Sequence, residues 1–421
     1  MLTNPAFFEQ LPAAAALPIL LALLIALRRR HSAFATRDWI LALGCIFFAQ
    51  LETFSAMSGH RWIYTTGHTT LLLGQLLAAV VLAFHKPARH STQRADLLFL
   101  VLNTLPLIAI SIIYGCYFFT PWPYLAASIV GIVMLLGTSL WQKRSMTVAL
   151  AGSACYAIDA ALAHAGYYRS TEYWILFCVY VIAIANLYQT LPRRTLGRFA
   201  ILTSMSIWSL TFIVHPWVMT QPQWIGFARQ IWELQKFFLC IGVLLLFLEE
   251  QVATTQWLAI HDQLTTLPNR RLLDDWLKRT IAAACADSRS FAVLLLDLDG
   301  FKAVNDTHGH AIGDYVLAEI ARRMQSHLHQ GEMLARLGGD EFVIVSSPIE
   351  THTSIDLLEQ RLQQAIREPL HVQGRDISVG GTFGTAIYPE DALDCDPAKI
   401  APTLLHIADQ RMYRRKKVQG R

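Results

Sequence analysis

The sequence predicts a multi-span α-helical membrane domain followed by a soluble α/β domain, and the main reason is an uneven distribution of charge. The chain has 421 residues, of which 54% are hydrophobic and 16% charged, and it is longer than the ~100–200 residues of one ordinary domain. Residues 1–250 contain 25 charged side chains and a net charge of +7, whereas residues 251–421 contain 41 and a net charge of −3. This division excludes a disordered chain, a uniform globular protein and a secreted disulfide scaffold. The chain has no basic stripe of the kind that binds nucleic acid.

Residues 1–248 are expected to form a transmembrane sensory domain of about nine helices. The expected spans are 11–27, 38–57, 69–85, 97–118, 123–141, 146–165, 173–190, 199–219 and 225–248. Each approaches the ~20 apolar residues that cross the hydrocarbon core as a helix. With the N-terminus outside, the cytoplasmic loops contain twelve Lys or Arg residues and the outer loops only Arg61 and Arg169, which fits the positive-inside rule. An odd number of spans then places the rest of the chain on the cytoplasmic side of a bacterial inner membrane.

The outer half of these expected spans contains ionisable side chains, which are expensive in lipid and therefore face a bundle interior or a cavity. The group comprises Glu52, Asp159, His164, His215, Arg229 and Glu233. Two interpretations remain open: a pocket for an unknown sensory ligand, a proton or a metal ion, or polar pairing between helices. The spacing identifies no metal geometry.

The connection between the two domains, residues 249–262, is expected to be helical. A heptad-like spacing of four and three residues separates Leu248, Val252, Thr255, Ala259 and Asp262. This pattern predicts either a short coiled coil or a plain amphipathic linker helix.

The seven cysteines are scattered singly along the sequence, at positions 45, 116, 155, 178, 240, 285 and 395. None forms a CxxC pair, and five lie in apolar segments. We therefore expect them to be small buried hydrophobic residues.

Residues 263–421 alternate between helical and strand patterns, as in an α/β domain. Helices are expected at about 270–285, 311–328, 353–367 and 398–418, and strands at 291–296, 333–337, 341–346, 369–373 and 376–388. Gly338 and Gly339 separate two of the strands, and a Gly-Gly pair between short apolar segments is typical of a tight hairpin.

Three acidic side chains lie at the ends of these predicted strands. Asp297 ends a buried strand, and Asp340 and Glu341 follow the Gly-Gly turn. Neighbouring carboxylates at such positions suit a hard divalent cation that holds a triphosphate. The alternative is that these residues only form turns.

Several motifs in order resemble the GGDEF family of diguanylate cyclases over about residues 258–421. The motifs are Gly338-Gly339-Asp340-Glu341-Phe342, the segment 262–271, the segment from Asp297 to Asp314, Tyr388-Pro389-Glu390-Asp391, and Ala408-Asp409 with Met412-Tyr413. The resemblance implies a nucleotidyl-cyclase fold, like that of a polymerase palm. Residues 1–257 resemble no named family.

The resemblance implies an enzyme that condenses two GTP molecules into cyclic di-GMP with release of two pyrophosphates. Each domain holds one GTP, so a homodimer is the active unit. Asp297, Asp340 and the backbone carbonyl of Leu298 are implied ligands of Mg²⁺ or Mn²⁺. Either Glu341 or Asp340 accepts the hydroxyl proton, and Lys302 stabilises charge on the phosphates.

The implied substrate-binding residues come from two parts of the domain. Asn305 and Asp314 recognise guanine, and Phe301 and His310 lie beside the nucleotide. At the C-terminus, Lys417 and Arg421 fit a KxxGR pattern that contacts phosphate. If the lysine is instead located by its distance from Tyr413 in the motif, it is Lys416. We favour Lys417, because an i, i+4 spacing places Lys417 and Arg421 on one helix face.

One departure concerns product inhibition, which in this family uses an RxxD sequence upstream of the signature. The corresponding residues here are His329-Gln330-Gly331-Glu332. They lack the arginine that grips a phosphate, so inhibition at this site is expected to be absent or weak. The favoured function is a membrane-bound, sensor-regulated diguanylate cyclase. The alternatives are a catalytically silent GGDEF domain that acts as a nucleotide-binding signalling module, and a transporter with a regulatory domain.

Overall fold

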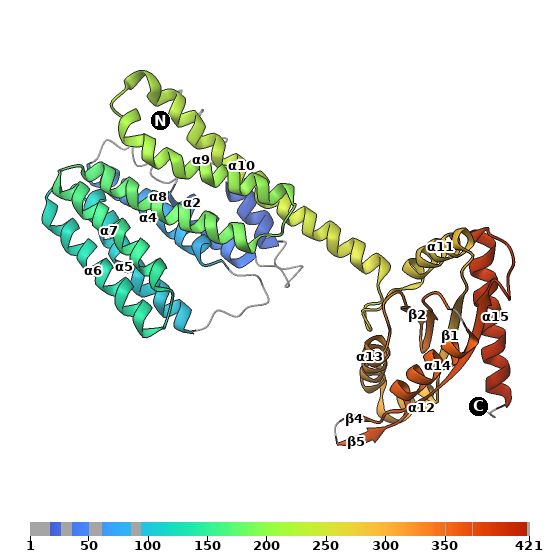
Figure 1. The fold of residues 1–421 in the computed structure, drawn as a ribbon. Helices are drawn as coiled ribbons and strands as arrows, with labels where there is room; N and C mark the ends of the chain where they lie inside the picture. The colour runs from blue at the N-terminus through green and yellow to red at the C-terminus, as the bar shows by residue number, and fades with distance from the viewer. Residues whose placement is uncertain are drawn as a thin grey trace. The chain divides into compact units, whose positions relative to one another are not determined.

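The computed structural model describes residues 17–26, 36–49, 61–85, 94–349, 351–372 and 374–418. The chain divides into two compact units, Met1–Glu250 and Gln251–Arg421 (Figure 1). The first unit is helical, and the second contains all the strands of the described residues.

The helical unit is built from long apolar helices. They are Leu17–Ala26, α2 (Thr36–Ala49), α4 (Arg61–Ala83), α5 (Arg94–Gly115), α6 (Pro121–Trp141), α7 (Met146–His164), α8 (Tyr168–Thr190), α9 (Leu196–Val218) and α10 (Pro222–Ile260). Within the described residues, the seven helices from α4 to α10 are long and apolar enough to cross a membrane. The multi-span helical fold class is therefore confirmed. The first two expected spans overlap Leu17–Ala26 and α2 and extend into residues that the structure does not describe, so the total of nine and the outward N-terminus stay predictions.

Close helix packing in this unit depends on small residues. Gly197 of α9 lies so near α10 that an added Cβ atom would come within 2.3 Å of the Leu246 backbone nitrogen. Large apolar side chains such as Val133 and Phe199 instead point outward, with 65% and 71% of their surface exposed. Close contact between helices at a glycine and large apolar side chains that point outward are both typical of a bundle surrounded by lipid.

The second unit is a four-stranded antiparallel sheet in the order β2-β3-β1-β6, with a separate two-stranded β4-β5 ribbon. Its elements are α11 (Arg270–Asp287), β1 (Phe291–Asp299), α12 (Phe301–His308), α13 (His310–Ser326), β2 (Met333–Gly338), β3 (Glu341–Val345), α14 (His352–Arg367), β4 (Leu370–Val372), β5 (Arg375–Ile377), β6 (Gly380–Tyr388) and α15 (Pro397–Val418).

Helices cover both faces of this sheet because the central strand β1 is apolar on both sides. Leu294 and Leu296 pack in one core with α12, α13 and α14, whereas Val293 and Leu295 pack in the other with α11 and α15. Alternate residues of a strand point to opposite faces, so Asp297 shares the face that α15 covers. This alternation decides which helix reaches the acidic residues.

The sequence predicted most of these elements but missed α12. Gly300, with φ of +75°, precedes α12, and Gly309, with φ of +82°, separates it from α13. A positive φ favours glycine, and the two glycines allow an eight-residue helix where the sequence analysis placed neither a helix nor a strand. The predicted strand 376–388 is also divided, into β5 and β6.

Candidate functional site

The acidic residues converge because β1 and β3 are neighbours. Asp297 pairs with Glu341 in the β1–β3 register, and the Leu298 amide donates a hydrogen bond to the Asp340 carbonyl at 3.3 Å. The hairpin between β2 (Met333–Gly338) and β3 turns at Gly339 and Asp340, and Gly338 pairs with Glu341 across it. The φ angles of Gly338 and Gly339 are +150° and +55°. Such angles strain any residue with a Cβ atom, so the glycine pair holds Asp340 and Glu341 beside the end of β1.

A lysine from the C-terminal helix reaches this group of acids. The Lys416 ammonium pairs with the Asp297 carboxylate, and both side chains are largely shielded from solvent. Lys417 instead lies over the Tyr413 ring, 4.5 Å from its centre, and Arg421 is outside the described residues. The structure therefore brings Lys416 to the acids, while the phosphate contacts expected of Lys417 and Arg421 stay predictions.

Burial and nearby charges raise the pKa of two of these acids, Asp297 and Glu341. The pKa of Asp297 lies above its usual value, mainly because of burial and in part because the Asp340 charge is close, although Lys416 acts in the opposite direction. The pKa of Glu341 is raised by burial first and then by the charges of Asp297, Asp340 and Asp409. Carboxylates crowded in this way gain stability from a bound cation.

The oxygen atoms present fit Mg²⁺ or Mn²⁺, which prefer carboxylate and carbonyl ligands. Among the described residues, no group of three or more His, Cys, Asp or Glu side chains is arranged to hold a metal ion by itself. The predicted ligand set contains only two side chains of these types, Asp297 and Asp340, together with the backbone carbonyl of Leu298. A nucleoside triphosphate would supply the remaining oxygen ligands from its phosphate groups.

A second group of predicted site residues lies on α12 and α13. Lys302, His310 and Asp314 have exposed side chains, and Asn305 is half-buried. A Cβ atom at Gly313 would come within 1.8 Å of the Asn305 Oδ1 atom, so this glycine lets Asn305 lie directly against the first turn of α13, next to Asp314. Phe301 behaves differently, because its side chain is buried in the core of the domain.

The segment 329–332 has an arginine partner that the sequence motif did not predict. Arg361 of α14 donates hydrogen bonds to both carboxylate oxygens of Glu332, at 3.0 and 3.1 Å. Its guanidinium also lies 2.7 Å from the His329 Nδ1 atom. Arg361 follows Glu332 by 29 residues in the sequence, so a local motif could not reveal it.

A second arginine joins the Gly-Gly turn to the segment that follows α10. The Arg336 guanidinium donates to Asp262 Oδ1 at 2.8 Å and to the Gly339 carbonyl at 2.7 and 3.0 Å. Asp262 Oδ1 also accepts hydrogen bonds from the amide and hydroxyl of Thr265. These donors hold the pKa of Asp262 below its usual value although burial acts the other way.

The ionisable residues of the helical unit do not all gather at one point. Asp159 is fully buried and accepts a hydrogen bond from Ser128 at 2.8 Å, whereas His164 is exposed. The His215 ring lies between Tyr173 and Trp232, with ring centres 4.2 and 4.7 Å away. The Glu52 residue and the side chains of Arg229 and Glu233 lie outside the described part of the structure.

Glu172, which the sequence reasoning overlooked, is the closest equivalent of Asp159. It is fully buried and accepts a hydrogen bond from Ser111 at 2.8 Å. Each of these two carboxylates has one oxygen atom without a hydrogen-bond partner. The buried hydroxyl group of Tyr124 also lacks a partner. A single glutamate near the predicted start of a span gave little signal in the hydropathy pattern.

Comparison with known proteins finds a family that matches the second unit. The family model described as "Diguanylate cyclase, GGDEF domain" matches residues 259–421. The bifunctional diguanylate cyclase/cyclic di-GMP phosphodiesterase MucR of Pseudomonas aeruginosa is 43% identical over 164 residues, which are 39% of this chain and 23% of that protein. Diguanylate cyclase TpbB of the same species is 37% identical over 167 residues, 39% of this chain and 37% of that protein.

Solved structures match the same region. The GGDEF domain of TpbB is 38% identical, and the match covers 37% of this chain and 88% of that one with a TM-score of 0.35. The sequence matches with MucR and full-length TpbB span 23% and 37% of those two proteins, well under half of either.

Proposed function

We propose that this chain, whose residues 259–421 belong to the GGDEF diguanylate cyclase family, is a membrane-bound enzyme that condenses two GTP molecules into cyclic di-GMP. The observation that carries the proposal is the meeting of Asp297, Asp340 and Glu341 at the β1–β3 edge. All three acids that the chemistry requires are retained. The relatives named diguanylate cyclase support the same reaction.

In this proposal the acidic edge serves the phosphates of GTP. Bound Mg²⁺ or Mn²⁺, held by Asp297, Asp340 and the Leu298 carbonyl, would neutralise phosphate charge and favour attack by a hydroxyl. Glu341 or Asp340 accepts the proton of the attacking 3′-hydroxyl. The pKa of Glu341, which burial and neighbouring charges raise, makes it a better proton acceptor than an isolated carboxylate. Lys416, now paired with Asp297, is positioned to contact phosphate oxygens from α15.

Guanine recognition in this proposal belongs to α12 and α13. The Asp314 carboxylate accepts two hydrogen bonds from the N1–H and N2–H₂ edge of guanine, an edge that adenine lacks. Because Gly313 has no side chain, Asn305 can lie against α13. From there it adds a second polar contact to guanine. Lys302 on the exposed side of α12 stabilises phosphate charge.

Each domain holds one GTP, so the reaction needs two domains in a homodimer. We propose that α10, which continues as one helix from Pro222 to Ile260, is the pairing element beyond the bilayer. Seven apolar helices of spanning length support an inner-membrane location, and the distribution of Lys and Arg among the loops supports a cytoplasmic GGDEF domain. The helical unit is then the sensor, and a signal acts through α10.

The test is synthesis of cyclic di-GMP by the purified full-length protein in lipid, with GTP and Mg²⁺. Product separated by chromatography and identified by mass spectrometry supports the proposal, with ATP as the control substrate. Binding of GTP without any product, in a preparation that is folded and dimeric, would support the silent nucleotide-binding module instead.

A further inference from the structure

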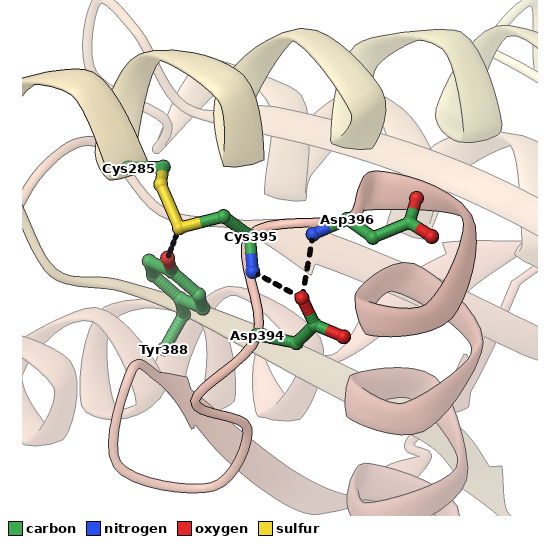
Figure 2. Close-up of a disulfide and its surroundings, with 5 residues drawn as sticks. All are labelled: Cys285, Tyr388, Asp394, Cys395 and Asp396. Atoms are coloured by element: carbon green, nitrogen blue, oxygen red, sulfur yellow. Dashed lines mark hydrogen bonds between the residues drawn. A yellow bond between two sulfur atoms is a disulfide. The ribbon is translucent and has the colours of Figure 1, made fainter.

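The two cysteines of the GGDEF domain are bonded to each other. Cys285 lies in the last turns of α11 and Cys395 in the loop before α15, 110 residues later in the sequence. Figure 2 shows their disulfide beside the Tyr388 hydroxyl, which lies 3.7 Å from the Cys395 sulfur. The expectation of buried single cysteines is therefore wrong for this pair, while the other five are free and belong to the helical unit.

We propose that Cys285 and Cys395 form a reversible thiol–disulfide modification site that adjusts cyclase output. The inference rests in part on the proposed function, because it assumes a domain in the reducing cytoplasm. Structural disulfides are rare in that compartment, and those that form there are usually redox-sensitive. A pair placed within bonding distance by folding is suited to such exchange.

The disulfide joins the first helix of the domain to the last one. α11 follows the segment that leaves α10, and α15 carries near its end the lysine that contacts Asp297. The two helices share one apolar core, in which Leu277 and Ile281 of α11 pack with Ile400 and Leu404 of α15. The covalent link therefore fixes the beginning of α15 against the helix nearest the membrane connection.

The bridge is accessible to reagents in solution. Cys395 is exposed and Cys285 is half-buried. The neighbouring Asp394 carboxylate accepts hydrogen bonds from the amides of Cys395 and Asp396, at 2.7 and 3.2 Å (Figure 2). A thiol or a phosphine can therefore reach the sulfur atoms without prior unfolding of the domain.

Reduction leaves the domain folded, because other contacts hold the same loop and helix. Arg411 of α15 pairs with Asp391 at 2.6 Å. A Cβ atom at Gly384 would lie 2.0 Å from the Ala408 carbonyl, so α15 packs closely on β6 without the disulfide. The reduced form thus differs from the oxidised form in the freedom of the loop around Cys395 and of the first turn of α15.

The chemistry balances with a dithiol protein or a peroxide as co-reactant. In reduction, two thiols of a dithiol protein give two electrons and two protons, so the Cys285–Cys395 bond becomes two thiols and the dithiol becomes a disulfide. In oxidation, hydrogen peroxide accepts two electrons from the two cysteine thiols and leaves as two molecules of water. We expect the reduced form to turn over about two- to fivefold more slowly, because the beginning of α15, the helix that carries Lys416, is then held less firmly.

The experiment uses the full-length protein in lipid, treated with hydrogen peroxide or with a phosphine reductant. Peptide mass spectrometry after alkylation determines whether Cys285 and Cys395 are joined, and hydrogen exchange reports the loop 389–396. The variants C285S and C395S mimic the reduced form, and C116S, which alters an exposed free cysteine of the helical unit, is the matched control.

The expected result is a cross-linked peptide only in the oxidised protein, with faster exchange and slower synthesis on reduction. Both serine variants should have the lower rate and no response to redox treatment, while C116S responds like the unaltered protein. Absence of the cross-linked peptide after peroxide treatment overturns the proposal, and so do equal exchange and equal turnover in the two states. If no condition gives cyclic di-GMP, the peptide and exchange data still decide the modification site, and only the proposed function fails.

Discussion

Arg336 and Asp262 form an ion pair of 2.8 Å that ties the entrance of the GGDEF domain to its signature turn. The same guanidinium donates to the Gly339 carbonyl, one residue before Asp340. Arg336 thus contacts both the segment that follows α10 and the backbone that positions the acids. One side chain therefore links the segment 261–269 to the candidate catalytic turn.

Replacement of Arg336 should uncouple the turn from the connector. We expect Arg336→Ala to lower cyclic di-GMP synthesis by about tenfold, since one or two kcal/mol of positioning is lost. Arg336→Lys keeps the charge but not the planar fork that serves two partners, so it should recover only part of the rate. The measurement is turnover of the full-length variants in lipid beside circular dichroism. Full activity in both variants would mean that the pair is dispensable.

Asp340→Asn should abolish cyclic di-GMP synthesis while the domain stays folded. The carboxylate lies beside Asp297 and Glu341, and removal of one charge from a divalent cation site forfeits several kcal/mol of transition-state stabilisation. The checks are product formation and the melting temperature. Near-normal turnover in this variant would remove Asp340 from the catalytic group.

Glu341 should make the metal-free domain less stable as the pH rises. Its pKa is raised in the folded state by burial and by neighbouring acids, so the folded domain binds more protons than the unfolded chain. Stability from this group therefore falls between the unfolded and folded pKa values and stays low above them.

Glu341→Gln should accordingly raise the melting temperature at neutral pH by about 1–3 °C and flatten its decline with pH. Glu368→Gln, a change at an exposed acid remote from the hairpin, serves as the control. Equal melting curves for Glu341→Gln and the unaltered protein would contradict the repulsion argument.

Product inhibition through residues 329–332 should be weak. Arg361 supplies a guanidinium there, but both of its terminal nitrogens already contact His329 and Glu332, and the glutamate repels a phosphate. Titration of cyclic di-GMP into a turnover assay tests this expectation. Strong non-competitive inhibition at low micromolar product that disappears in Arg361→Ala would show that the pair opens to admit the product.

Local sequence signals predicted those contacts of this domain that depend on the alternation of residues along a strand and on the geometry of a turn. The Gly-Gly turn and the buried strand before Asp297 place the acids correctly, because hairpins and alternation are short-range features. The family resemblance extended the prediction to the whole of residues 259–421, and the family match confirms it.

Long-range contacts were not predictable in this way. Lys416 meets Asp297 across 119 residues, and its selection over Lys417 depends on the rotation of α15 about its axis. The Cys285–Cys395 bond and the Arg361–Glu332 pair also join residues far apart in the sequence. Each depends on how helices pack on the sheet, which spacing along one helix does not determine.

The buried carboxylates of the helical unit give the last prediction. Asp159 and Glu172 each accept one hydrogen bond from a serine, and each keeps one oxygen without a partner in the described residues. Burial of charge without a compensating cation is costly, so binding of a proton or a cation at either group would favour one arrangement of α5, α6, α7 and α8.

Asp159→Asn and Glu172→Gln remove the negative charge and keep an acceptor for the serine. If the pair is part of the sensor, these variants should change cyclic di-GMP output in proteoliposomes at least about twofold and reduce its response to external pH. Ser128→Ala removes only the donated hydrogen bond and should mainly lower the melting temperature. Unchanged output in both charge-neutral variants, with altered melting alone, would identify the carboxylates as polar pairing that holds the helices together.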